Sequence, residues 1–327
     1  MTSKRLGAPP RILVTGASGF VGQKLVNRLR AAEPNACVIP VHGPLNVDGA
    51  LSLDLADVDA CLAMVQEVRP TVIVHLAALS SVGATLADTD GVWRSNFDGT
   101  RALARAALAL ETDVRFVFAS SGEVYGRQFN NGPCDEDAPF APASPYARTK
   151  AACEYLLNDL ASERMSIVVL RLFNHSGPGQ EERFVVPSFA AQVAGLERGG
   201  RGGQIKVGNL DASRDFSDVE DIIDAYLAVI RHERPLSRFS VFNVGSGENR
   251  SIRSIVDALI GLATAPIEPV SDPARMRPGD VAVARGVFER FRAEFGWSPA
   301  RPFDQTIADV LQDQRARLIH AHRSRQD

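Results

Sequence analysis

The sequence predicts an α/β protein with a doubly wound parallel sheet and a smaller α/β lobe towards the C-terminus. Three observations lead to this prediction. Short apolar runs alternate with helical patterns in five strand–helix units before residue 120. The first unit carries a glycine-rich turn between its strand and its helix, at residues 16–22. The alternation then becomes irregular after residue 172, where Gly177, Pro178 and Gly179 mark the change.

Length and composition narrow the class of protein. The 327 residues, 45% of them apolar, are enough for a large core in two domains or lobes. The formal net charge of −3 gives no sign of the basic surface that binds nucleic acid. No apolar run is long enough to span a membrane. The first ten residues lack the apolar core of a signal peptide. The four cysteines lack metal-ligand spacing, so we expect reduced thiols in a cytoplasmic protein with no metal site.

The first strand, residues 11–15, runs into a G-x-x-G-x-x-G turn and then a helix to about residue 32. In this context the helix N-terminus meets a phosphate group. Gly16 permits the tight turn, Gly19 lets the backbone approach a pyrophosphate, and Gly22 packs the helix on the strand. The dinucleotide contacts predicted here are Gly16, Ser18, Gly19, Phe20, Val21 and Gly22.

The second strand, residues 36–41, bears on the choice of cofactor. An acidic residue near its end would bind the adenosine ribose hydroxyls of NAD, and none is present. Room is left for a 2′-phosphate with His42 as its neighbour, but no arginine is close. The cofactor therefore stays open between NADPH and NADH.

The next two strands, residues 51–55 and 71–76, complete the predicted cofactor site. Asp54 either accepts a hydrogen bond from an adenine amino group or caps the helix that runs to residue 68. Small residues after His75, itself expected to be a packed strand residue, leave space for a ribose. The predicted contacts are Asp54, Leu55, Leu76, Ala77 and Ala78.

A helix at 93–110 has little polar surface over residues 101–110, so it lies under the sheet or in a subunit contact.

Candidate catalytic residues follow the strand at 114–119. Ser121 lies at the carboxyl end of this strand, where open α/β sheets bind ligands. Pro145 favours a helix start, which places Tyr146 and Lys150 on one helical face. A nearby ammonium lowers the pKa of a phenol from about 10, and such a tyrosine exchanges a proton with a sugar hydroxyl or ketone oxygen. Ser121 would hold the same oxygen. The spacing alone also fits a solvated surface helix.

The second half of the chain has fewer clear elements. After a sixth strand at 167–172 we expect strands at 204–208 and 240–244. Residues 209–216 lead into a helix from 218, and a further helix covers 251–262. Residues 272–280 form a loop, and two helices finish the chain.

Taken together, the glycine turn, Asp54-Leu55, the run 75–78, Ser121 and Tyr146-x-x-x-Lys150 resemble the extended short-chain dehydrogenase/reductase family. The resemblance covers essentially the whole chain. It implies a Rossmann domain that binds NAD(P), with Ser121, Tyr146 and Lys150 as catalytic residues. It assigns 1–174 and about 215–245 to this domain, and 175–214 and 246–327 to a nucleotide-sugar lobe.

Family members that act on nucleotide sugars place an asparagine after the sixth strand, an arginine before Asp-Phe, and an Arg-Pro-x-Asp motif. Asn174, Arg214 and Arg277 match these positions, and an arginine fork suits a diphosphate. The run 208–211 resembles that of GDP-sugar enzymes, and 173–180 and 272–277 resemble those of bacterial GDP-4-dehydro-6-deoxy-D-mannose reductases. The implied substrate contacts are Ser80, Ser121, Glu123, Tyr146, Asn174, Arg214, Arg275 and Arg277.

One position separates two reactions of this family. A 4,6-dehydratase oxidises C4, removes a proton from C5 and expels the C6 hydroxyl, and hexose dehydratases generally carry Asp-Glu or Ser-Glu after the catalytic Ser/Thr. Here the pair is Gly122-Glu123. Gly122 has no side chain to donate a proton, whereas Glu123 remains.

The resemblance thus implies a homodimeric, NADPH- or NADH-dependent reductase of the C4 ketone of GDP-4-dehydro-6-deoxy-D-mannose, giving GDP-D-rhamnose. Three alternatives stay open: a GDP-mannose 4,6-dehydratase, a nucleotide-sugar 4-epimerase, and a non-enzymatic dinucleotide-binding regulator. The intact set of Ser121, Tyr146 and Lys150 argues against the last.

Overall fold

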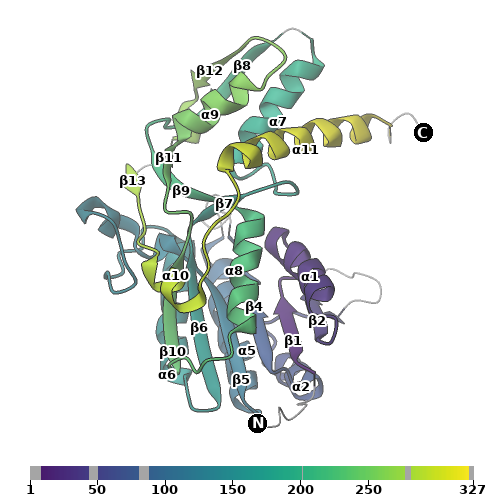
Figure 1. The fold of residues 1–327 in the computed structure, drawn as a ribbon, viewed down its shortest axis with the longest axis vertical. Helices are drawn as coiled ribbons and strands as arrows, with labels where there is room; N and C mark the ends of the chain where they lie inside the picture. The colour runs from purple at the N-terminus through teal and green to yellow at the C-terminus, as the bar shows by residue number, and fades with distance from the viewer. Residues whose placement is uncertain (1–8, 44–50, 81–87, 201, 277–280, 324–327) are drawn as a thin grey trace. The chain divides into compact units, whose positions relative to one another are not determined.

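The computed structural model describes residues 9–43, 51–80, 88–200, 202–276 and 281–323 (Figure 1). The chain forms two compact units. The first consists of Met1–Ser121, Ser144–Arg171 and Tyr226–Phe242, and the second of Gly122–Ala143, Leu172–Ala225 and Asn243–Asp327.

The first unit is built on a seven-stranded sheet with the order β10-β6-β5-β4-β1-β2-β3. Every pairing among β1 to β5 is parallel. The chain builds β1, β2 and β3 in one direction, then returns to add β4 and β5 on the other side of β1, which is the doubly wound arrangement that the sequence predicts. The strands are β1 (Arg11–Thr15), β2 (Cys37–His42), β3 (Leu51–Ser52), β4 (Val72–His75), β5 (Val114–Ser121), β6 (Met165–Leu172) and β10 (Phe239–Val244).

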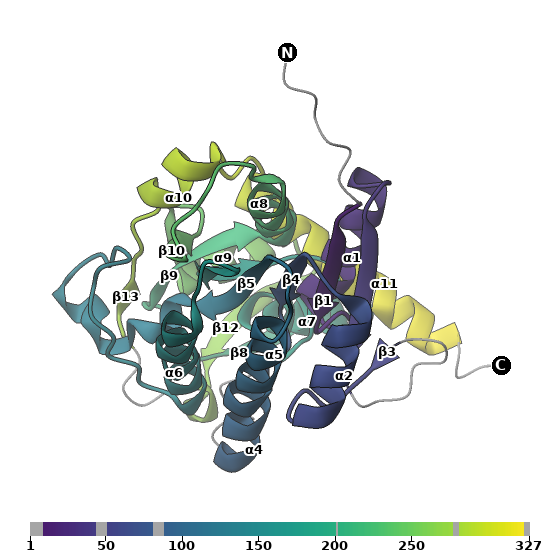
Figure 2. The ribbon, with the colours of Figure 1, turned by 90° about the horizontal axis from the view of Figure 1, so that it is seen from below.

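Helices cover both faces of this sheet (Figure 2), with α1 and α8 on one face and α2, α5 and α6 on the other. The core between the strands and the second group contains Val65, Ile73, Leu103, Phe116 and Leu157. The buried face of α5 packs there, while Leu108 is exposed. The helices are α1 (Phe20–Ala32), α2 (Val58–Val68), α4 (Thr89–Trp93), a π-helical turn (Arg94–Asp98), α5 (Gly99–Leu108), α6 (Pro145–Leu160) and the part of α8 (Val219–Arg231) from Tyr226 onwards.

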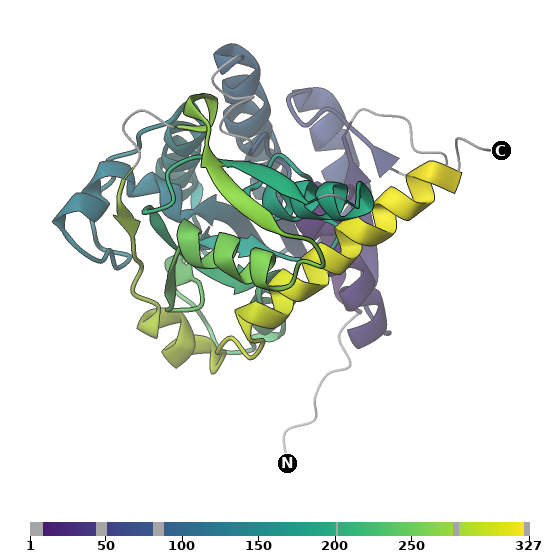
Figure 3. The ribbon, with the colours of Figure 1, turned by 90° about the horizontal axis from the view of Figure 1, so that it is seen from above.

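The second unit has a four-stranded sheet of β7, β9, β11 and β13, and a separate parallel pair of β8 and β12. Its core lies among α7, α9, α11, β8 and β9 (Figure 3). The elements are β7 (Asn174–Ser176), α7 (Val185–Arg198), β8 (Gly203–Val207), β9 (Ser213–Asp218), β11 (Asn249–Ser251), α9 (Ile252–Gly261), β12 (Ile267–Ser271), β13 (Val283–Ala284), α10 (Glu289–Phe295) and α11 (Phe303–Arg323).

Strand β9 corrects the expectation that residues 209–216 only lead into a helix. Its sequence is almost entirely polar, which is atypical of a buried strand. The strand is nevertheless buried, and neighbouring groups satisfy its two carboxylates, Asp215 and Asp218. Asp215 accepts hydrogen bonds from the backbone N–H groups of Ser246 (2.8 Å) and Gly247 (2.6 Å). Strand β12 was also not predicted.

None of the helices that the structure describes is both long enough and apolar enough to cross a membrane.

The glycine turn after β1 depends on the absence of side chains. Gly16 has φ +71°, and a Cβ added there would lie 2.7 Å from the backbone nitrogen of Ala77, at the end of β4. A Cβ at Gly22 would lie 2.1 Å from the carbonyl oxygen of Gly16. The tight turn and the close packing of helix on strand are therefore as the sequence predicts.

We expect Gly16→Ala to lower the free energy of unfolding by about 1–3 kcal/mol, because the new side chain is strained and meets backbone atoms. Urea denaturation measures this loss. Gly43→Ala is the matched control, since a Cβ there meets nothing within 4 Å. Equal stability of the two variants would contradict the prediction.

Candidate active site

The three predicted catalytic residues all belong to the first unit. Ser121 is the last residue of β5, and Tyr146 and Lys150 lie in the first turns of α6. This helix starts as predicted: Pro145 occupies its first turn, and the Ser144 side chain accepts a hydrogen bond from the N–H of Ala147 at 3.1 Å. Ser121 and Lys150 are buried and Tyr146 is half-buried.

Lys150 brings the helix to the end of the strand. Its ammonium donates a hydrogen bond to the carbonyl oxygen of Ala119 at 2.6 Å. It also lies 4.6 Å from the ring centroid of Phe118 and 5.9 Å from that of Tyr146. The structure thus places a cation beside the tyrosine, as the spacing of four residues predicts.

His75 is a packed strand residue, as expected, and it also takes part in a buried polar chain. Its Nδ1 is 2.7 Å from the Thr15 hydroxyl and its Nε2 is 2.9 Å from the Thr100 hydroxyl. The Thr100 hydroxyl donates its only proton to the carbonyl oxygen of Asn96 at 2.5 Å. Nε2 therefore donates to Thr100, and Nδ1 accepts from Thr15. Burial, and then the charge of Lys150, lower the pKa of His75 to about 3, so the ring is neutral.

Asn96 is a buried positioning residue that the sequence analysis missed. Its Oδ1 accepts from the N–H of Leu79 at 2.8 Å, and its Nδ2 donates to the Leu79 carbonyl at 3.2 Å and to the Thr149 hydroxyl at 3.1 Å. Asn96 lies in the π-helical turn. It joins the segment before Ser80 to the residue next to Lys150. Its neighbours Arg94, Ser95 and Asp98 are polar as well, so no local pattern distinguishes Asn96 as a buried residue.

The predicted cofactor contacts at the glycine turn, Leu76, Ala77 and Ala78 lie together, because β1 and β4 are neighbours and their carboxyl ends meet. The first turn of α1 offers backbone N–H groups, since its cap, Gly19, makes no side-chain cap hydrogen bond. His42 ends β2, and its Nδ1 is buried without a hydrogen-bond partner among the described residues.

The carboxylate of Asp54 has two partners within the chain. Its Oδ1 accepts from the N–H of Ala56 at 3.0 Å, and its Oδ2 pairs with Arg94 at 2.8 Å. The cap of α2 is Asp57, whose side chain accepts from the N–H of Ala60. The capping alternative for Asp54 is therefore wrong. A contact with adenine would have to compete with the exposed Arg94 pair.

Most of the predicted substrate contacts lie in the second unit. Asn174 begins β7 and is exposed, and Glu123 is exposed in a 3₁₀ turn. Arg214 is buried in β9, where its Nη1 donates to the Ser213 carbonyl at 2.8 Å. Arg275 is exposed and its Nη1 donates to the Ser188 hydroxyl at 3.2 Å. Ser80, in the first unit, is half-buried, and Arg277 lies outside the described residues.

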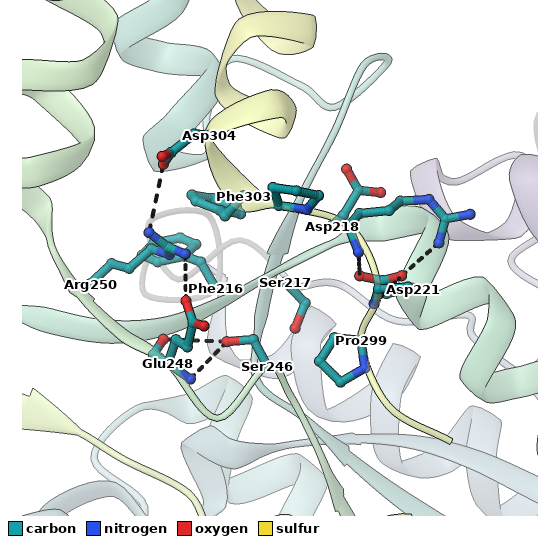
Figure 4. Close-up of a pocket in the computed structure, with 13 residues that line it drawn as sticks. Phe216, Ser217, Asp218, Asp221, Ser246, Glu248, Arg250, Pro299, Phe303 and Asp304 are labelled. Carbon is teal, nitrogen blue, oxygen red and sulfur yellow. Dashed lines mark hydrogen bonds and ion pairs between the residues drawn. The ribbon is translucent and has the colours of Figure 1, made fainter. Parts of the chain in front are cut away.

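A pocket of about 350 Å³ in the second unit contains none of the predicted site residues (Figure 4). Its charged side chains pair with one another. Arg301 contacts Asp221 at 2.6 Å and Asp224 at 2.9 Å, and Arg250 contacts Glu248 at 2.6 Å. The pairs of Arg301 hold the segment that leads into α11 against α8, so we assign the pocket a structural role.

We expect His75 to make the fold acid-sensitive. Its pKa is about 3 in the folded state and 6.5 ordinarily, so between these values the unfolded chain binds a proton that the folded chain does not. The free energy of unfolding therefore falls as pH falls from 6.5, by at most roughly 1.4 kcal/mol per unit. Urea denaturation at several pH values should show a flatter dependence for His75→Gln, whose amide can replace both hydrogen bonds. An identical slope in the variant and the wild type would contradict this.

Comparison with known proteins agrees with this geometry. The family model for GDP-mannose 4,6 dehydratase matches residues 13–310. GDP-6-deoxy-D-mannose reductase from Pseudomonas aeruginosa is 34% identical over 310 residues, which cover 94% of this chain and 98% of that protein. The structure of RMD from Pseudomonas aeruginosa complexed with NADPH has a TM-score of 0.81 at 32% identity, covering 94% of this chain and 98% of that one. UDP-glucose 4-epimerase from Thermus thermophilus in complex with NAD has a TM-score of 0.78 at 28% identity, covering 93% and 99%. The chain therefore belongs to the GDP-mannose 4,6-dehydratase family within the extended short-chain dehydrogenases/reductases, as its motifs predict.

Proposed function

We propose that this protein is an NAD(P)H-dependent reductase of the C4 ketone of GDP-4-dehydro-6-deoxy-D-mannose, which it converts to GDP-D-rhamnose. The observation that carries the proposal is the buried Lys150 ammonium between the end of β5 and Tyr146, with Ser121 next along the strand. The similarity to GDP-6-deoxy-D-mannose reductase supports the choice of substrate.

The residues present fit a dinucleotide. The turn at Gly16 has no room for a Cβ, and the uncapped N-terminus of α1 suits a pyrophosphate. Residues Gly16 to Gly22, together with Leu76, Ala77 and Ala78, would hold it, which makes the first unit the NAD(P)-binding part. Relatives of known structure carry NADPH or NAD. When bound, the reduced nicotinamide supplies the hydride.

Residues of the chain supply the proton and hold the substrate in position. Tyr146 donates its hydroxyl proton to the C4 oxygen, and Ser121 holds that oxygen by a hydrogen bond. Lys150 stabilises the phenolate that remains and binds the nicotinamide ribose. Asn174, Arg214 and Arg275 in the second unit, with Arg277, would hold the GDP-sugar, where arginine matches a diphosphate.

Gly122 supports reduction over elimination. The residue has no side chain to protonate a leaving hydroxyl. A Cβ added there would lie 2.9 Å from the Phe173 ring, so the position also lacks room. Glu123 keeps the dehydratase as the second candidate, because one carboxylate that could act as a base is present.

We further propose a cytoplasmic homodimer. All four cysteines are free thiols, which suits a reducing compartment. Leu108 on α5 is exposed, which leaves apolar surface on this helix for a second copy.

The activity is tested by incubating the protein with GDP-mannose alone, and then with the 4-keto-6-deoxy sugar and NADPH or NADH. We expect no 4-keto product from GDP-mannose, and stoichiometric loss of reduced-nicotinamide absorbance with the keto sugar. Conversion of GDP-mannose without added reductant would instead establish the dehydratase.

We expect Tyr146→Phe to lower kcat by roughly 10²–10⁴-fold, because the variant lacks the proton donor. Cofactor affinity, followed by fluorescence titration, should stay within about 3-fold. Tyr155→Phe on the same helix is the matched control, since this side chain is 65% exposed. Retained turnover in Tyr146→Phe would remove Tyr146 from the mechanism.

Arg214→Ala and Arg275→Ala should each weaken GDP binding by roughly 10-fold or more, since hydrogen bonds to charged groups contribute about 1.5–3 kcal/mol. Isothermal titration with GDP measures this, and NADPH affinity should be unchanged. Arg253→Ala serves as the control, because Arg253 is an exposed arginine of the second unit that pairs with Asp211. Unchanged GDP affinity in both variants would show that the substrate contacts are assigned wrongly.

A further inference from the structure

Glu154 is a buried carboxylate on α6, one turn after Lys150, and no role has so far been given to it. Only 2% of the residue is exposed. Arg171 on β6 binds it through two nitrogens, with Nε at 3.0 Å and Nη2 at 2.8 Å from Oε2. The Ser120 hydroxyl donates to Oε1. A single side chain therefore links β5, β6 and α6.

Stability alone is a weak explanation for such a pair. Removing two charges from water is costly, and apolar residues of similar volume often stabilise a fold equally well. The location of the cluster is more informative. Ala119 and Ser120, the two residues before Ser121, are bound to α6 by Lys150 and Glu154 respectively. Two side chains one helical turn apart thus hold the end of β5.

The charges around Lys150 give Glu154 a second effect. Burial lowers the pKa of Lys150 to about 8, and Cys153 and Glu154 oppose this shift. Burial raises the pKa of the Cys153 thiol to about 11, so Cys153 is uncharged near neutral pH. The other titratable neighbours are Tyr146 on α6, neutral His75 on β4, and Tyr226 on α8, which interacts with Tyr146. Glu154 is therefore the anion that favours the charged form of Lys150, and Arg171 on β6 partly offsets its charge.

We propose that Glu154 is a positioning residue of the active site: with Arg171 and Ser120 it fixes the strand end that carries Ser121, and it keeps Lys150 a cation beside Tyr146. The inference rests on the proposed roles of Ser121, Tyr146 and Lys150, and it adds a carboxylate on which those roles depend.

The first test measures the charge of Lys150 without any substrate. The chain has only four lysines, so ¹³C labelling at lysine Cε gives a simple NMR titration, with Lys150→Arg to assign the signal. In the full-length protein we expect Glu154→Gln to lower the Lys150 pKa by about 1–3 units, the effect of losing a nearby opposite charge. Asp159→Asn is the matched control, because Asp159 is an exposed carboxylate on the same helix. An unchanged Lys150 pKa in Glu154→Gln would overturn the electrostatic part of the proposal.

The second test uses the pH dependence of kcat/KM with the keto sugar and NADPH. We expect the basic limb of the profile to move to lower pH in Glu154→Gln by the same number of units as the Lys150 titration. A merely structural role would lower the rate at every pH and leave the limb in place, which would overturn the proposal.

Glu154→Gln leaves the buried Arg171 without its carboxylate and can impair folding. The double variant Glu154→Gln with Arg171→Met removes both charges and should displace the Lys150 titration in the same direction but by less, because Arg171 partly offsets the charge of Glu154. A wild-type titration curve in the folded double variant would count against the proposal. Failure of the wild-type protein to reduce the keto sugar would count against the proposed function alone, since the NMR readout needs no substrate.

Discussion

A buried ammonium is the constraint on which much of the first unit depends. Lys150 is 2% exposed, and an unpaired charge in such a place is very unfavourable. Three kinds of partner lower this cost: the carbonyl oxygen of Ala119, the face of the Phe118 ring, and the carboxylate of Glu154. Because each partner belongs to β5 or α6, the charge can be accommodated only when strand and helix are correctly paired. Correct pairing of β5 with α6 is therefore needed both for the packing of these two elements and for the chemistry of Tyr146.

Other buried polar groups of the first unit also have hydrogen-bond partners. The chain from Thr15 through His75 and Thr100 to Asn96 leaves no ring nitrogen of His75 without a partner. A fully satisfied network of this kind is rigid, because moving one member leaves another unpaired in a low-dielectric interior. The network joins the strand that enters the glycine turn to the helix that carries Lys150. Two parts of the site that are distant in sequence are thus held in one arrangement.

Local sequence patterns predict the strands and helices whose bounds are set by neighbouring residues. Strand β1 has the predicted bounds, and α6 begins at the predicted proline, because alternation, glycine and capping signals act over a few residues. The doubly wound parallel sheet and the approach of Lys150 to Tyr146 are also as the sequence patterns predict.

What the sequence does not reveal depends on distant partners. Strand β9 is polar, and the groups that satisfy its Asp215, the N–H groups of Ser246 and Gly247, lie 31 and 32 residues further along the chain. The pairing of Glu154 with Arg171 and Ser120 joins three elements, and no periodicity in the chain signals which charges will meet. Asp54 binds Arg94, 40 residues later, and no local pattern signals this pair.

The π-helical turn at Arg94–Asp98 has a geometric consequence for the helices on either side of it. A π-turn holds one residue more than an α-turn, so the segments before and after it differ in phase by about 100°. The apolar stripe of α5 can then face α2 and α6, while α4, although continuous with it, directs a different stripe towards α6. Loss of a single residue from this turn would bring the two stripes into one line. Asn96 would then rotate away from Leu79 and Thr149, although every residue of the network would still be present in the chain.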